Sequence, residues 1–171
     1  SIDDINPQNK ISTYKMSTSI KVSGKNLQNI IVGTNKKDQI TGTSEGEILA
    51  GLKGKDVLKG GASADGFLFN HSKGFGKKNA DLIKDFDPEE GDSILLDNDL
   101  FELGKKIKLK SYASKSKVKK AAKSKNDFLY EEKKGLLYFN ENGKQKGWGD
   151  GGLFAKLQSA PDLGADDFTI V

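Results

Sequence analysis

The chain has 171 residues, enough for one domain of ordinary size, and 35% of them are apolar. It contains no cysteine and one histidine, which excludes disulfides, cysteine-ligated zinc and thiol chemistry. No apolar run approaches the ~18 residues needed to span a membrane, and nine phenylalanines argue against disorder. No charged-then-apolar leader opens the chain, and Ser1 in place of Met suggests a processed or excised piece.

The net charge of +4 conceals two regions of opposite sign. Every basic residue is a lysine, and ten of the 28 lie in residues 105–125, where no acid occurs. The rest of the chain carries 18 lysines against 24 acids. Because the reading of bases depends mainly on arginine, we expect no specific nucleic-acid partner.

Residues 1–23 mix scattered apolar residues with polar ones, and the stretch ISTYKMSTSIKV is rich in β-forming residues. One or two strands are therefore expected there. They either cover the open end of the repeats that follow or belong to the tail of an upstream domain.

Glycine recurs every nine residues from residue 24 to residue 60, which marks an internal repeat of five units. The units read GKNLQNIIV, GTNKKDQIT, GTSEGEILA, GLKGKDVLK and GGASADGFL. The eighth position is always apolar, and a flexible glycine-rich linker would not keep such positions in phase. The sixth position is polar or acidic in every unit: Asn29, Asp38, Glu47, Asp56 and Asp65.

The nine-residue spacing predicts half a coil of a parallel β-roll per unit, with a six-residue turn and a three-residue strand. Only the middle strand residue points inward, so the eighth positions build a narrow apolar core. Two units complete a coil, which stacks Asp38 on Asp56 and Glu47 on Asp65 about 4.8 Å apart. Stacked carboxylates repel each other unless a cation lies between them, and carboxylate and carbonyl oxygens favour Ca²⁺.

An acid-rich flank follows the repeats at residues 79–97, NADLIKDFDPEEGDSILLD. The stretch DFDPEEGD predicts a turn between two strands, and SILLD predicts that the second strand is buried. Asp81, Asp85, Asp87 and Asp92 can ligate a further cation, although capping and turn hydrogen bonds are the favoured role of the last three.

The basic segment at residues 105–125 starts with strand-like alternation and continues as a stretch of lysine, serine and alanine. It is either a solvated surface loop or helix, or a site that attracts polyanions such as acidic polysaccharide. Residues 127–171 then alternate strands and tight turns, including a hairpin at DFLYEEKKGLLYFNENGK. Trp148 lies between glycines as a half-buried packing residue or a platform for a sugar.

The repeats resemble the G-G-x-G-x-D-x-U-x nonapeptide of the RTX family, which includes serralysin C-terminal domains and the R-modules of alginate epimerases. Residues 79–97 resemble the segment after the last repeat of that family, and residues 136–171 resemble its C-terminal β segment. The resemblance implies a calcium-binding module of a secreted, extracellular protein, with Asp81 helping to close the last metal site. It also implies that the type I secretion machinery reads the acidic-then-apolar end, residues 166–171.

The turns depart from the family pattern. Thr34, Thr43 and Leu52 replace the second leading glycine in three units. Asn140-Glu141-Asn142-Gly143 stands where the family often has Asp-x-Asp-Gly. These losses favour a modest affinity for Ca²⁺, or a degenerate roll that keeps its shape without metal.

The expected fold is all-β, with a short parallel β-roll at residues 24–70 that merges into an antiparallel C-terminal region at residues 71–171. The expected function is calcium binding that folds the module outside the cell. An alternative is a carbohydrate- or polyanion-binding accessory module of an extracellular polysaccharide-modifying enzyme, acting through the lysines of residues 105–125. We expect no catalysis from this segment, while an active site in a larger parent protein stays open. The expected Ca²⁺ ligands are Asp38, Asp56, Glu47, Asp65 and Asp81.

Overall fold

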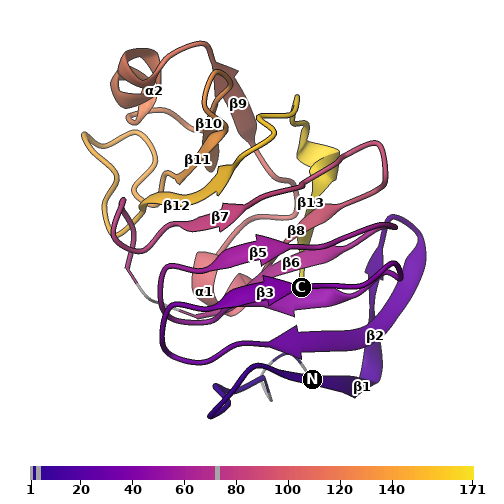
Figure 1. Ribbon diagram of the computed structural model, residues 1–171. Helices are drawn as coiled ribbons and strands as arrows, with labels where there is room; N and C mark the ends of the chain where they lie inside the picture. The colour runs from indigo at the N-terminus through magenta and orange to yellow at the C-terminus, as the bar shows by residue number, and fades with distance from the viewer. Residues whose placement is uncertain (1, 3–4, 72–73) are drawn as a thin grey trace.

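The computed structural model describes residue 2, residues 5–71 and residues 74–171. Most of the chain forms short β-strands joined by turns (Figure 1). No helix in these residues is long and apolar enough to cross a membrane. In chain order the elements are β1 (Ser12–Val22), β2 (Lys25–Val32), β3 (Gln39–Thr41), β4 (Ile48–Ala50), β5 (Val57–Lys59), β6 (Gly66–Phe69), β7 (Asp81–Ile83), β8 (Ser93–Leu96), α1 (Asn98–Phe101), β9 (Leu109–Tyr112), α2 (Lys115–Ala121), β10 (Phe128–Glu131), β11 (Leu136–Phe139), β12 (Gly152–Leu157), a 3₁₀ helix (Ala165–Asp167) and β13 (Phe168–Ile170).

The strands form two sheets. The first is six-stranded with the order β1-β2-β4-β6-β8-β13, and the second is seven-stranded with the order β3-β5-β7-β12-β11-β10-β9. Successive strands of the repeat therefore alternate between the sheets, and parallel pairs join residues 18 apart, such as Ile31 with Leu49 and Ile40 with Leu58. The strands β7 and β8 extend the parallel stacks beyond the last repeat.

The predicted β-rich fold is confirmed, and both sheets are mixed. The pairs β1–β2, β10–β11 and β11–β12 are antiparallel. The expectation of an antiparallel C-terminal region is wrong in part, because β12 pairs with β7, β13 with β8 and β9 with β10 in parallel. Long connections bring these later strands back to strands that run in the same direction, which a local hairpin pattern does not reveal.

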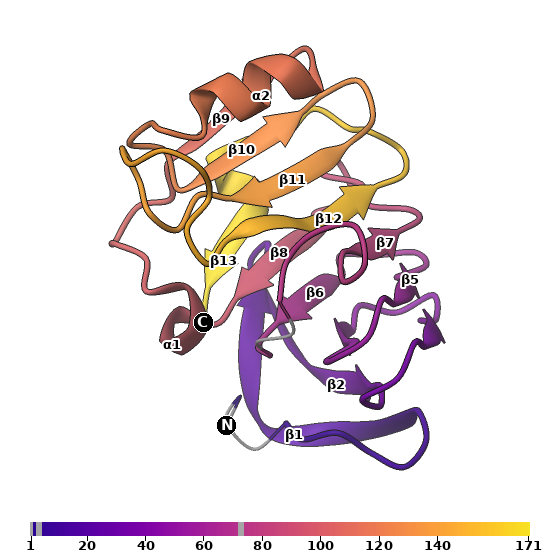
Figure 2. The same cartoon turned by 90° about the vertical axis from the view of Figure 1, so that its left-hand side faces the viewer.

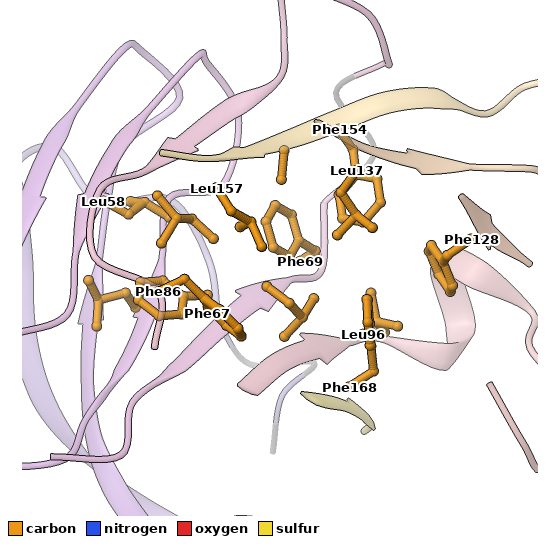
Figure 3. Packing of buried hydrophobic residues seen from close by; sticks show 14 of the residues in the cluster. Leu58, Phe67, Phe69, Phe86, Leu96, Phe128, Leu137, Phe154, Leu157 and Phe168 are labelled. Carbon is orange, nitrogen blue, oxygen red and sulfur yellow. The ribbon is translucent and has the colours of Figure 1, made fainter. Parts of the chain in front are cut away.

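The main core lies between the sheets (Figure 3). It contains the eighth position of every repeat, and each of these side chains is at most 5% exposed. Aromatic rings continue the core toward the C terminus, where Phe128 stacks on Phe168 with centroids 5.4 Å apart. Burial of each such side chain contributes about 1.5–3 kcal/mol to stability. The eighth positions are Ile31, Ile40, Leu49, Leu58 and Phe67.

A second core covers the other face of the six-stranded sheet. Ile30 and Ile48 point to that face, and Met16 and Val22 of β1 pack against it with Ile5. β1 continues the sheet by pairing with β2, with an irregular register between Lys15 and Ile20. The six-stranded sheet is therefore buried on both sides, and this explains its continuous apolar runs.

The basic segment is built into the seven-stranded sheet. Its first part is β9, which pairs with β10, and its second part is α2, which begins after the N-cap residue Ser114 (Figure 2). Val118 and Ala122 anchor this stretch and are 1% and 3% exposed, while most of the lysines face solvent. One apolar residue per helical turn is enough to attach a strongly charged helix to a sheet.

Candidate metal centre

Two ladders of carboxylates run through the turns at opposite sides of the stacked strands. The first joins Asp38, Asp56 and Asp81, and the second joins Glu47, Asp65 and Asp92. In each step, a carboxylate accepts a hydrogen bond of 2.8–2.9 Å from the backbone N–H of the acid in the preceding coil. The structure thus brings Asp38 to Asp56 and Glu47 to Asp65, the pairs named from the sequence, and it adds the contact of Asp81 with Asp56.

The linkage differs from a simple stack of carboxylates. The carboxylate of one coil bonds to the main chain of the preceding coil. Four of the six acids therefore already stabilise the coil stack through a hydrogen bond, namely Asp56, Asp65, Asp81 and Asp92. Leading glycines make room for this arrangement, because a Cβ at Gly51 or Gly60 would overlap the carboxylate of Asp56 or Asp65. The glycine period and the acid column therefore have one common cause.

Two threonines that follow the leading glycines of their repeat units donate hydrogen bonds to the same acids. Thr34 donates its backbone N–H to Asp38 Oδ2 at 2.7 Å and its hydroxyl to Asp38 Oδ1 at 3.0 Å. Thr43 donates its N–H and its hydroxyl to the two carboxylate oxygens of Glu47. These two substitutions supply hydrogen bonds to a carboxylate and so provide part of the stabilisation that a cation would provide.

Asp65 differs from Asp38 and Glu47. Its Oδ1 accepts the Glu47 N–H at 2.9 Å, while its buried Oδ2 has no hydrogen-bond partner among the described residues. Asp85 takes the N–H groups of Gly60 and Gly61 at 2.9 Å each, so these donors do not serve Asp65. A buried carboxylate oxygen without a donor fits a hard cation, and this observation supports Ca²⁺ at this turn.

The flank contains a ladder residue that sequence reasoning placed among the capping acids. Asp92 accepts the N–H of Asp65 at 2.9 Å and the N–H of Asp87 at 2.9 Å. Insertions lengthen the interval to 27 residues here, and to 25 between Asp56 and Asp81, which breaks the period of 18. A different signal survives, since an acid two positions before a buried apolar strand residue marks Asp81 and Asp92 as it marks the repeats.

Burial controls the charge of two of these acids. Desolvation raises the pKa of Asp65 to about 7, opposed by its backbone hydrogen bond and reinforced by the carboxylates of Asp92, Glu47 and Asp85. The same cause raises the pKa of Asp92 to about 7. Within the described residues, no three acidic or histidine side chains are arranged to hold a metal, so a site here needs turn carbonyls as well.

These pKa values predict how the metal-free protein responds to pH. Between pH ~4 and ~7 the unfolded chain has released both protons while the folded chain retains them, so stability falls as pH rises. The slope approaches ~1.4 kcal/mol per pH unit for each group. Urea unfolding in chelator at several pH values measures it as the difference between the wild type and the Asp65→Asn/Asp92→Asn variant. A difference independent of pH would contradict the assignment.

A turn near the C terminus is held by the side-chain amide of Asn140. Asn140 donates its side-chain amide to the carbonyls of Ser124, Asn126 and Gly143 at 3.0–3.1 Å. A carboxylate at this position would place negative charge against three carbonyl oxygens and would call for a cation. Asn140 instead places a neutral amide there, although Asn140 Oδ1 and Asn142 Oδ1 are buried without a hydrogen-bond partner among the described residues.

Comparison with known proteins found similarity among solved structures. No family model matches the chain, and no curated protein matches it. Among solved structures, it is similar to the AlgE6R3 subunit of the Azotobacter vinelandii mannuronan C5-epimerase, at 23% identity and a TM-score of 0.40, over 80% of each chain. At so low a TM-score the match does not bear on which residues bind a ligand.

Proposed function

We propose that this chain is a calcium-binding RTX-type module of a secreted protein, in which residues 24–70 form a short β-roll completed by β7 and β8. The observation that carries the proposal is the pair of buried carboxylate ladders, in which Asp65 Oδ2 is buried and accepts no hydrogen bond from any described residue. Six acids drawn into two columns, all at most 9% exposed, are costly to bury unless hydrogen bonds and a cation compensate them.

The ligands we propose are the five acids named from the sequence, together with turn carbonyls. Glu47 and Asp65 form one candidate pair, and the buried Oδ2 of Asp65 has no hydrogen-bond partner among the described residues. Asp38 and Asp56 form the second pair, which Asp81 extends by one coil. A bound Ca²⁺ would supply positive charge against these carboxylates and keep them ionised.

Folding coupled to the ion follows from this arrangement. A site assembled from turns 18 residues apart does not exist in the unfolded chain, so the free energy of binding adds to the free energy of folding. We further propose that the module leaves the cell by type I secretion and folds outside it, where Ca²⁺ is abundant. The C-terminal strand β13 pairs with β8, so residues 168–170 become accessible to an exporter when that sheet is open.

Thermal unfolding tests the function directly. With Ca²⁺ at about 100 times its Kd, one site adds ~2.7 kcal/mol, which for a chain of this size raises Tm by roughly 5–10 °C. Turns of modest charge predict a Kd on the order of 10⁻⁴–10⁻³ M. Mg²⁺ at the same concentration is the control and should shift Tm much less, since it demands a tighter octahedral site. The same Tm in chelator and in Ca²⁺ would refute the proposal.

A further inference from the structure

The loop between β11 and β12, residues 140–151, contains the dipeptide Asn142-Gly143. Each of the other ten asparagines of the chain precedes a residue that has a side chain. Glycine has no Cβ to shield its backbone nitrogen, so this nitrogen can approach the side-chain amide of the residue before it. For this reason Asn-Gly is the dipeptide most prone to form a cyclic imide, the intermediate of asparagine deamidation.

The backbone nitrogen of Gly143 is free to act as the nucleophile. Among the described residues, its N–H group donates no hydrogen bond. Apart from the two chain neighbours, the described atom nearest to a Cβ at Gly143 would be Ser124 O, at 4.0 Å. The φ of Gly143 is +59°, which glycine adopts without strain. The backbone at Gly143 can therefore rotate without breaking a bond of its nitrogen and without meeting a neighbour.

The amide group that this nitrogen would attack is weakly held. Asn142 Nδ2 donates one hydrogen bond, to Lys146 O at 3.2 Å, and Oδ1 accepts none among the described residues. The amide carbon faces Gly149, where a Cβ would lie 3.2 Å from it, so the lack of a side chain at Gly149 keeps this approach open. Asn140, by contrast, donates to three carbonyls at 3.0–3.1 Å and precedes Glu141, so an asparagine of low reactivity lies beside the reactive one.

We propose that Asn142 is a site of spontaneous deamidation. The Gly143 nitrogen loses its proton to solvent and forms a bond to Cγ of Asn142, and the side-chain nitrogen takes up a proton and leaves as ammonia. The cyclic imide then takes up one water molecule and opens at one of its two carbonyl carbons. Opening gives aspartate or isoaspartate at position 142, and in isoaspartate the main chain runs through the former side chain.

The modification reaches an aromatic side chain of the same loop. Trp148 stacks on Tyr138 with ring centroids 4.9 Å apart and planes 14° from parallel. Both rings line a hollow of about 610 Å³ on the outer face of the seven-stranded sheet, over β7, β12 and β11. The position of the loop therefore determines the shape of one wall of this hollow.

Asn142 holds this loop by two hydrogen bonds. Its backbone carbonyl accepts the N–H of Gln145 at 3.3 Å, and its side-chain amide donates to the Lys146 carbonyl. A carboxylate cannot donate to that carbonyl, and isoaspartate also displaces the backbone carbonyl that accepts from Gln145. Deamidation therefore loosens the loop that carries Trp148.

Mass spectrometry of one tryptic peptide tests the assignment, because residues 135–144 lie between two cleavage points and contain both Asn140 and Asn142. Incubation of the folded protein in Ca²⁺ at mildly alkaline pH should convert Asn142 over days to weeks, with isoaspartate in excess, and leave Asn140 intact. The rate should rise with pH because the Gly143 nitrogen must lose its proton. Gly143→Ala, whose Cβ shields this nitrogen, should slow the conversion about tenfold or more.

The free peptide of residues 135–144 is the reference for the folded protein. Conversion in the free peptide, with none at Asn142 of the folded protein, would show that the loop protects the site and would overturn the proposal. Equal conversion of Asn140 and Asn142 in the folded protein would also overturn it, because the loop would then confer no selectivity.

Fluorescence of Trp148, the sole tryptophan, tests the effect on the loop. Asn142→Asp reproduces one product, and Asn98→Asp is a matched control that adds the same charge at an exposed position of α1. Acrylamide should quench Trp148 more readily in Asn142→Asp than in fresh wild type, and equally in Asn98→Asp and wild type. Equal quenching in all three would overturn the loosening of the loop. Neither variant alters the carboxylate ladders, so the result does not depend on calcium binding.

Discussion

In metal-free solution at neutral pH or above, the Asp65→Asn variant should be at least as stable as the wild type, whereas in Ca²⁺ it should be the less stable of the two. Asparagine keeps a side-chain oxygen for the Glu47 N–H and removes a buried charge. Because burial raises the pKa of Asp65 to about 7, ionising it above that pH costs the folded protein about 4 kcal/mol. The buried amide group of the variant, left without an acceptor, costs ~1–3 kcal/mol, which is less.

Calcium reverses this order because the wild type then gains the free energy of binding, ~2.7 kcal/mol per site near saturation, and the variant does not. Urea unfolding in chelator and in Ca²⁺ measures both differences. Asp150→Asn, at an exposed position, is the matched control and should change neither. A variant that is destabilised equally in both solutions would show that Asp65 acts through its hydrogen bond alone.

Gly61→Ala should destabilise the protein by about 3–5 kcal/mol, a large part of the ~5–15 kcal/mol that holds a typical domain folded. Gly61 has a φ of +93°, and a Cβ there would overlap the backbone carbonyl of Thr43 in the neighbouring coil. The substitution therefore adds a steric clash between coils to the strain of the left-handed backbone.

Gly76→Ala separates these two costs. Gly76 has a similar φ of +105°, but among the described residues, its two chain neighbours aside, no atom would lie within 4 Å of a Cβ there. We expect a loss of ~1–3 kcal/mol from backbone strain alone. Urea unfolding of both variants gives the comparison, and equal losses would mean that the coils are not packed as closely as described.

The repeat made the interior of the fold predictable. A nine-residue period with an apolar eighth position is strong enough to place Ile31, Leu49 and Phe67 in one core, since few other structures repeat so regularly. The pairing of the acids also followed from the period. Asp92 was missed as a ladder residue because an insertion changes the spacing, although the strand that follows it was correctly expected to be buried.

Other features depend on contacts that no sequence pattern contains. The parallel pairing of β12 with β7 joins segments some seventy residues apart, and local turn signals carry no information about it. The hollow on the outer face draws lysines from across most of the chain, between Lys55 and Lys156. The density of lysines in residues 105–125 made this segment the expected site for polyanions. Val118 packs with Tyr138, and Lys115 is the one lysine of the segment that lines the same hollow as Tyr138 and Trp148.

The roles of Thr34 and Thr43 show why family comparison alone misleads. As departures from a glycine pattern they suggested a weakened metal site, while the structure shows them donating to Asp38 and Glu47. A carboxylate supplied with such donors needs a cation less than Asp65 does. Each of the two proposed pairs therefore contains one carboxylate that is supplied with such donors, Asp38 in one pair and Glu47 in the other.

Anomalous diffraction from crystals grown with Ca²⁺ tests the central claim most directly, because it locates the ions. The account predicts an anomalous peak within Ca²⁺–oxygen distance, about 2.3–2.6 Å, of a carboxylate oxygen of Asp65, with turn carbonyls completing the coordination. A second peak is expected between the turns of Asp38 and Asp56. Crystals at saturating Ca²⁺ with no peak along either ladder, or with peaks only at exposed acids elsewhere, would show that these carboxylates are purely structural.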